Sequence, residues 1–181
     1  MSLEVGFMDP SVPFFFSEIH RQCLVAVLRR IVGYYGTRLV SLIVFGSYAR
    51  REPRLNSDLD LLVILGSGSW SRLSERTEEF VGNVEQPCDD ELQMLFEEGI
   101  SMDLSPVILL REEAKGFLPF YLDMVGNSLT IEDHDGFFSD VLEKVKGQMA
   151  RWGSERVNVS GHWLWEIRPG LKWNEILRYD Q

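Results

Sequence analysis

The chain has 181 residues, of which 45% are hydrophobic and 25% are charged, so it can form the core of a globular domain. Its formal net charge is −10, from 28 acidic and 18 basic residues, and this excess of acid argues against general binding to nucleic-acid phosphates. No apolar run approaches the roughly 20 residues that a membrane-spanning helix needs.

The chain is expected to be a cytoplasmic protein with one main domain. The N-terminal sequence "MSLEVGFMDPSVPFFF" lacks the basic region of a secretory signal peptide. The cysteines, Cys23 and Cys88, do not have the spacing of metal or redox motifs and are expected to be reduced. We expect a flexible lead-in at 1–16, a main domain at 17–132, and a C-terminal helix with a Trp-rich tail at 133–181, packed on the same domain.

Hydrophobic periodicity predicts helices and strands along the whole chain. Ser17 is the expected N-cap of a first helix, in which Cys23, Val27 and Ile31 recur every four residues and share one face. In the first half of the chain, the predicted elements are a helix from 17 to 33 or 36, a strand at 38–46, a helical turn at 47–52, a strand at 58–65, and helical pieces at 71–82 and 89–98. In the second half they are a strand at 100–110, a helix with a proline kink at 111–126, a short strand or turn at 127–133, a helix at 137–152 and irregular β structure at 157–177. Pro106 places the 100–110 strand at a sheet edge or a bulge. This pattern predicts an α/β (α+β) fold with a small mixed sheet flanked by helices.

The segment "LIVFGSYARREPRLNSDLDLLVIL" at 42–65 sets a polar insert between two apolar runs. Asp58 and Asp60 lie two residues apart on a predicted strand, so their side chains point to the same face. Burying two like charges without a counter-charge would cost several kcal/mol each. A hard cation such as Mg²⁺ removes this conflict, because carboxylate oxygens are its preferred ligands. The pair therefore predicts a metal site, with a solvent-facing pair at a strand end as the alternative.

A candidate phosphate site lies earlier in the same segment. Gly46 follows a predicted strand and precedes a short helical turn, where a glycine lets a phosphate approach the backbone closely. The following N–H groups and the Ser47 hydroxyl can donate to phosphate oxygens. Arg50 and Arg51 add charge that can pair with phosphate, with a solvated surface position as the alternative.

A third carboxylate, Asp103, lies in the 100–110 strand. If that strand pairs with 58–65, Asp103 reaches the face that carries Asp58 and Asp60. Three carboxylates could then hold two metal ions, one on a triphosphate and one that lowers the pKa of an attacking hydroxyl. The alternative for Asp103 is an edge-strand residue or a turn cap.

Other conspicuous side chains are given no catalytic role. His20, His134 and His162 have no ligand spacing between them. Tyr48 either packs under the sheet or stacks on a base. The Trp-rich tail is expected to be packed rather than to form an aromatic platform.

The stretch "FGSYARREPRLNSDLDLLV" resembles the signature of the nucleotidyltransferase superfamily, with Gly-Ser, a spacer and Asp-x-Asp between apolar residues. The spacer, 48–57, has 10 residues, which suits the minimal nucleotidyltransferases. The similarity continues through "MDLSPVILLREEAKGFLPFYLDMVGNSLTIED" and the ending "GHWLWEIRPGLKWNEIL". A lone Asp-x-Asp also occurs in sugar-nucleotide glycosyltransferases, which do not need the preceding Gly-Ser.

The resemblance implies a nucleotidyltransferase fold and Mg²⁺-dependent transfer of AMP, or another nucleoside monophosphate, from a nucleoside triphosphate to a hydroxyl. It assigns Gly46 and Ser47 to the triphosphate, Asp58 and Asp60 to metal, and Asp103 to metal or general base.

The resemblance leaves the acceptor open. Some members of the family modify proteins, such as the antitoxins that adenylylate HEPN-type toxins. Others modify small molecules such as aminoglycosides. A toxin acceptor would act in trans. The rival interpretations are a non-catalytic nucleotide-binding or protein-interaction module with this fold, and an antitoxin that acts mainly by docking.

Overall fold

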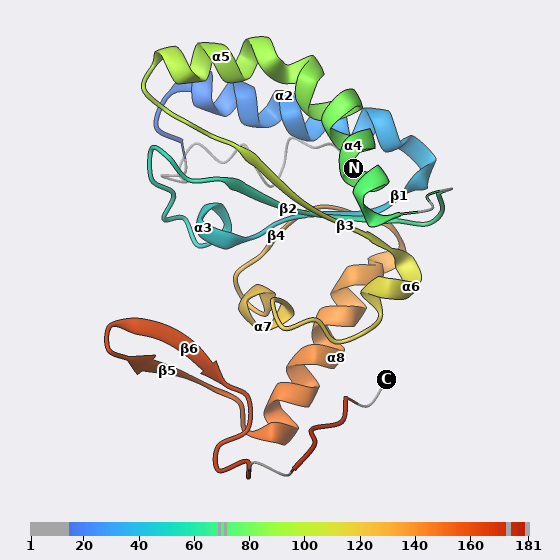
Figure 1. Ribbon diagram of the computed structural model, residues 1–181, viewed down its shortest axis with the longest axis vertical. Helices are drawn as coiled ribbons and strands as arrows, with labels where there is room; N and C mark the ends of the chain where they lie inside the picture. Colours follow the sequence, from blue (N-terminus) through green and yellow to red (C-terminus); the bar gives the residue numbers. More distant parts are fainter. Residues whose placement is uncertain (1–14, 69, 71, 173–174, 180–181) are drawn as a thin grey trace.

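The computed structural model describes residues 15–68, 70, 72–172 and 175–179. The predicted lead-in at 1–16 lies almost wholly outside this part of the chain, as does Trp173 of the Trp-rich tail. A four-stranded sheet separates two layers of helices (Figure 1). None of the described helices is long and apolar enough to cross a membrane.

The first helix, α2 (Glu18–Tyr35), forms as its capping residues and apolar spacing predict. The Ser17 hydroxyl accepts a hydrogen bond from the His20 N–H at 3.1 Å, which satisfies one of the free donors at the helix start. The helix ends before Gly36, whose φ of +50° favours glycine. The face that carries Cys23 and Val27 is fully buried against the sheet.

The sheet is mixed, as predicted. Its strands are β1 (Leu39–Val44), β2 (Leu59–Leu65), β3 (Leu104–Leu110) and β4 (Leu129–Asp133), in the order β3-β2-β1-β4. β1 pairs antiparallel with β2 and β4, whereas β2 and β3 are parallel. Pro106 lies on β3, at the edge of the sheet, where a missing N–H costs least.

Both faces of β2 are covered, so the strand is almost continuously apolar. Leu61 and Val63 contact the core on the side of α2, while Leu62 and Ile64 contact a second core on the opposite side. By this alternation Asp60 belongs to the second face, near the start of the strand, where its side chain is half-buried.

The layer beside α2 differs from the prediction of two separate helical pieces. A helical course runs from α4 (Leu73–Phe80) through a π-helical turn, η2 (Val81–Glu85), and a 3₁₀ turn, η3 (Gln86–Cys88), into α5 (Asp89–Glu97). Pro87 does not break this course, because it lies in the first positions of η3, where its missing N–H would have no helical partner.

The opposite layer contains α6 (Arg111–Ala114), α7 (Tyr121–Met124) and α8 (Phe137–Trp152). The prediction of one kinked helix at 111–126 is wrong, because the chain forms two four-residue helices there. Gly116 is a weak helix former and Pro119 disfavours a helical residue before it, so the segment between them turns instead. α8 has its predicted bounds, and its apolar face packs on the same sheet.

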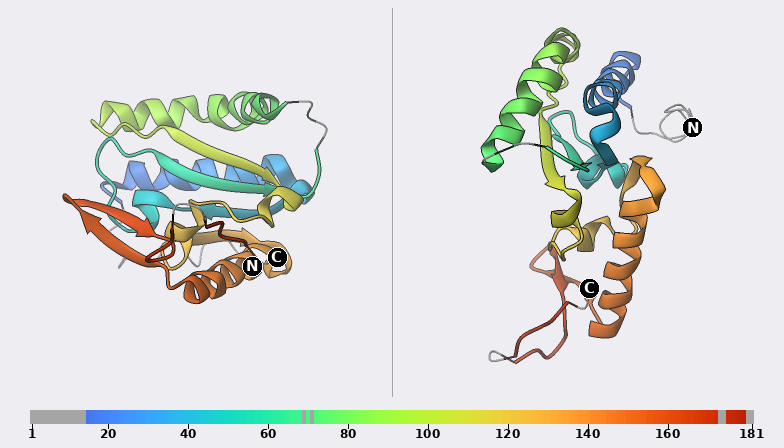
Figure 2. Two further views of the ribbon diagram at one scale, coloured as in Figure 1. Left: turned by 60° about the horizontal axis from the view of Figure 1, so that its bottom comes forward. Right: turned by 90° about the vertical axis from the view of Figure 1, so that its right-hand side faces the viewer.

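The C-terminal part is a regular β-hairpin, β5 (Glu155–Val159) and β6 (His162–Glu166), rather than irregular β structure. It extends from the end of α8 beyond the sheet (Figures 1 and 2). Trp165 Nε1 donates to Asp123 Oδ1 at 2.9 Å, which ties the hairpin to α7. Trp163 is 60% exposed, so the expectation of a packed tail is wrong for this residue.

Candidate active site

The Gly-Ser turn forms directly after β1. Its one-turn helix, α3, comprises Gly46–Ala49, and Gly46 has a φ of +67°. A Cβ atom added to Gly46 would lie only 1.9 Å from Asp60 Oδ2, so no other residue fits without displacing the carboxylate. The backbone of the turn and the Asp60 carboxylate are therefore in direct contact.

Asp60 is held inside the sheet. It pairs with Ser105 of β3, and its carbonyl oxygen accepts a hydrogen bond from the Phe45 N–H at 3.0 Å. Burial and the neighbouring Asp58 carboxylate raise the pKa of Asp60, against the opposing effects of the Arg50 guanidinium and a hydrogen bond with Ser105. A cation bound at this pair would relieve the repulsion that raises the pKa.

Asp58 and Asp103 occupy equivalent places on neighbouring strands. Leu59 pairs with Leu104, and the Leu59 N–H donates to the Asp103 carbonyl oxygen at 2.8 Å. Asp58 and Asp103 therefore immediately precede the first paired residues of two parallel strands. The backbone brings all three predicted aspartates, Asp58, Asp60 and Asp103, to the same end of the sheet, where β2 and β3 begin.

The side chains are not brought together to the same degree. Within the described part of the chain, no three His, Cys, Asp or Glu side chains are arranged to hold a metal ion. The predicted strand at 100–110 would have held Asp103 in the ladder, but β3 begins only at Leu104 and the Asp103 side chain is exposed. An arrangement of three carboxylates around two ions therefore stays a prediction.

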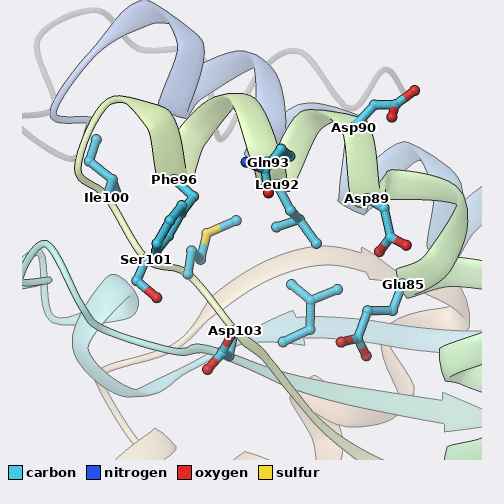
Figure 3. Close-up of a pocket in the computed structure, with 11 residues that line it drawn as sticks. Glu85, Asp89, Asp90, Leu92, Gln93, Phe96, Ile100, Ser101 and Asp103 are labelled. Carbon is cyan, nitrogen blue, oxygen red and sulfur yellow. The ribbon is translucent and has the colours of Figure 1, made fainter.

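Asp103 also lies at the rim of a cavity of about 490 Å³ between α5 and the segment that leads into β3 (Figure 3). Glu85, Asp89 and Asp90 line this cavity together with Phe96, and its lining contains no basic side chain. Burial, Asp103 and Asp89 raise the pKa of Glu85, in that order. The acidic segment that precedes β3 thus forms a negatively charged wall beside one of the predicted site residues.

The residues predicted to bind phosphate all lie on or next to α3. Ser47 is partly buried, and its carbonyl oxygen accepts from the Glu52 N–H at 2.9 Å. Arg50 is exposed and close enough to lower the pKa of Asp60. Arg51 is exposed, with a φ of +63°. Contacts of these residues with phosphate stay predictions.

Two features of the site were missed from the sequence. Ser105 hydrogen-bonds Asp60, and its spacing of two residues from Asp103 was the available signal, since such residues share a face of a strand. Tyr48 packs under the sheet, which settles the alternative left open above, and its hydroxyl contacts the buried His20. No local pattern indicated this pairing.

The geometry agrees with a family comparison. Residues 26–113 match the family model described as a nucleotidyltransferase domain, and this range includes Gly46, Ser47, Asp58, Asp60 and Asp103. Together with the mixed sheet and its flanking helices, the match identifies residues 26–113 as a nucleotidyltransferase domain. The predictions of the fold, the family and an enzyme of nucleotidyl transfer are confirmed.

Similar proteins include one curated relative and several solved structures. The "Putative protein adenylyltransferase MJ1305" of Methanocaldococcus jannaschii is 29% identical over 114 residues, which cover 62% of this chain and 71% of that protein. A toxin–antitoxin structure of MntA and HepT has a TM-score of 0.39 and 13% identity over 72% of this chain and 92% of the other. A toxin–antitoxin structure with AMP-PNP has a TM-score of 0.39 and 15% identity over 70% and 90%.

Proposed function

We propose that this nucleotidyltransferase transfers AMP from ATP to a hydroxyl group of a protein, in a reaction that requires Mg²⁺. The observation that supports the proposal is the contact between the Gly46 backbone and the Asp60 carboxylate, which sets the turn that we assign to phosphate directly against one of the two carboxylates that we assign to metal. The name of the curated relative, a protein adenylyltransferase, supports AMP as the transferred group and a protein as the acceptor.

Asp58 and Asp60 are the residues we assign to Mg²⁺. Both supply hard oxygen donors, and the raised pKa of Asp60 reflects a burial and a repulsion that a cation would offset. Bound there, Mg²⁺ would neutralise the charge of the triphosphate. The carboxylate pair and the adjacent turn therefore fit the ion that the family implies.

The other roles follow from position. The Gly46–Ser47 turn would donate hydrogen bonds to the triphosphate, with Arg50 as a charged partner. The acceptor oxygen would bond to the α-phosphorus while the bond to the bridging oxygen of pyrophosphate breaks. Asp103 is the third carboxylate, and it would act either as a further metal ligand or as the base that takes the hydroxyl proton.

The acceptor we propose is a toxin protein of the HEPN type, bound in trans, as in the family precedent. The net charge of −10 and the acidic wall beside Asp103 disfavour a polyanionic acceptor such as a nucleic acid. The same wall makes a polycationic small molecule of the aminoglycoside type the second candidate acceptor, because four carboxylates line the cavity.

The test is transfer of label from α-labelled ATP, with and without Mg²⁺, to a co-purified HEPN-type protein and, separately, to an aminoglycoside. We expect labelled protein with the wild type, and no label with Asp58→Asn or after chelation of the metal. Equal transfer by the wild type and Asp58→Asn would contradict the assigned role. Label on the aminoglycoside alone would replace the protein acceptor by the second candidate.

A further inference from the structure

A buried hydrogen bond lies beneath the Gly-Ser turn. Tyr48 occupies the third position of α3, and its hydroxyl lies 3.0 Å from His20 Nε2. Both side chains have 0% exposure. The bond joins the first turn of α2 to the short helix that carries Gly46 and Ser47, although neither His20 nor Tyr48 is assigned to phosphate or metal.

The hydrogen-bond pattern fixes the proton of His20. The Phe16 N–H donates to His20 Nδ1 at 3.3 Å, so in the neutral ring the proton must reside on Nε2. Burial lowers the pKa of His20 to about 4, against the opposing effect of Glu98, so the ring is neutral at neutral pH. His20 Nε2–H therefore donates to the Tyr48 oxygen.

The position of His20 is itself constrained. The Phe16 ring stacks on the imidazole, with ring centroids 5.3 Å apart. The Ser17 hydroxyl accepts from the backbone N–H of His20, and it also donates to Glu98 at 2.6 Å. His20 thus offers Tyr48 a donor whose location is fixed by the start of α2.

The turn that Tyr48 belongs to has little stability of its own. α3 has four residues and no side-chain cap, and a single helical turn is unfavourable in isolation. Its orientation therefore depends on its anchoring to β2 through Phe45 and Gly46 and on what its side chains contact. The buried Tyr48 is the side chain of α3 that reaches deepest into the core, and Gly46 lies two residues before it, against Asp60.

We propose that His20 is a positioning residue for nucleotidyl transfer, which acts through Tyr48 to hold the Gly46–Ser47 turn where it meets the triphosphate. The inference rests on the proposed function for its kinetic consequence, whereas its structural consequence does not depend on activity. Neither His20 nor Tyr48 touches the substrate, because both are buried.

The first measurement is amide hydrogen exchange in Tyr48→Phe, which removes one hydroxyl and keeps the ring. The Arg50 N–H bonds Gly46 O at 3.1 Å and the Glu52 N–H bonds Ser47 O at 2.9 Å, so these amides report on the turn. We expect them to exchange about fivefold faster, since the hydrogen bond with His20 is lost, while the amides of β1 are unchanged. Tyr34→Phe is the matched control, because it removes a hydroxyl bonded to Glu79 at 2.8 Å, at the far end of α2.

The second measurement is steady-state kinetics with ATP. Tyr48→Phe should raise KM for ATP about fivefold with a smaller change in kcat, because the turn binds the triphosphate. His20→Leu should do the same, and His20→Gln should restore KM, since its amide can donate to Tyr48. A merely structural role would lower thermal stability in all three without this pattern in KM.

The outcomes separate the two proposals. Unchanged exchange of the Arg50 and Glu52 amides in Tyr48→Phe would overturn the positioning role, whatever the activity. Faster exchange with an unchanged KM would overturn its kinetic part. A wild type that transfers no nucleotide would defeat the proposed function, while the exchange data would still decide whether Tyr48 holds the turn.

Discussion

Asp60 and Asp103 lie at the same end of two adjacent parallel strands, yet their surroundings are opposite. Asp60 is inside the ladder, packs on Gly46 and is hydrogen-bonded to Ser105. Asp103 precedes the ladder, is exposed and lies near Glu85. One carboxylate is therefore preorganised beside the turn that we propose to bind phosphate, and the other is exposed at the side where we expect the acceptor. A site divided in this way fixes the nucleotide first and leaves the acceptor side adaptable.

The largest loss of activity should come from a substitution of Asp60, the preorganised carboxylate. Asp60→Asn removes the charge of a proposed metal ligand at a fixed position, and losing one electrostatic group of that kind costs about 10²–10³ in rate. We expect AMP transfer to fall by about a thousandfold at saturating Mg²⁺. Asp140→Asn, an exposed change on α8, should retain full activity. Activity of Asp60→Asn within about tenfold of the wild type would contradict preorganisation as the source of catalysis.

The contact between the turn and Asp60 can be broken from the other side. Gly46→Ala places a Cβ at 1.9 Å from Asp60 Oδ2, so either the turn or the carboxylate must move. A displacement of about 1 Å in a site can cost about 10² in rate, which is the loss we expect.

Gly153→Ala is the matched control for Gly46→Ala. Gly153 has a φ of +69°, close to the +67° of Gly46, but a Cβ there would meet nothing within 4 Å. Both variants should lose about 1–2 kcal/mol of unfolding free energy through backbone strain, and only Gly46→Ala should lose transfer. Equal activity of the two variants would show that the clash with Asp60 has no catalytic consequence.

The difference between Asp60 and Asp103 also separates what the sequence could predict from what it could not. The turn at Gly46 and the strand at Asp60 were predictable because they depend on local patterns, a Gly-Ser after one apolar run and alternation in the next. The start of β3 at Leu104 was not, since it depends on pairing with β2. The exposure of Asp103 follows from that start, and so escaped prediction too.

Contacts between distant segments show the same limit. The bond between His20 and Tyr48 joins residues 28 apart, and neither residue stands in a pattern that indicates the other. The break after α6 was in principle readable from Gly116 and Pro119. The tether of the hairpin through Trp165 and Asp123 was not, because it depends on how α7 and α8 pack.

A smaller loss of activity is expected from a substitution of Asp103, the exposed carboxylate. Asp103→Asn keeps the shape of the side chain but removes its charge, and we expect transfer to fall by about 10–100-fold, less than for Asp60→Asn. The measurement is kcat for AMP transfer, with KM for ATP as the internal comparison. Because we propose that Asp103 faces the acceptor rather than the triphosphate, KM for ATP should change little. A loss as large as that of Asp60→Asn would mean that both carboxylates are equally organised when substrate is bound.

The smallest expected effect is the change in stability caused by Asp60→Asn. This substitution should lower activity but raise the stability of the metal-free protein. Because the pKa of Asp60 is raised on folding, the folded state binds this proton more tightly than the unfolded state does. Ionised Asp60 therefore lowers the stability of the metal-free protein above its folded pKa. This loss is recovered as the pH falls toward the unfolded pKa of about 3.9.

Asp60→Asn should accordingly unfold at a higher temperature than the wild type at neutral pH without metal, and the difference should shrink as the pH is lowered. Mg²⁺ should reverse the order, because a ligand at about 100 times its Kd adds about 2.7 kcal/mol to the stability of the form that binds it. Asp140→Asn serves as the control and should respond to Mg²⁺ as the wild type does. The measurement is thermal unfolding at several pH values with and without the ion. If Mg²⁺ stabilised Asp60→Asn as much as the wild type, the ion would not be held by this carboxylate, and the contrast with Asp103 would concern packing rather than the site.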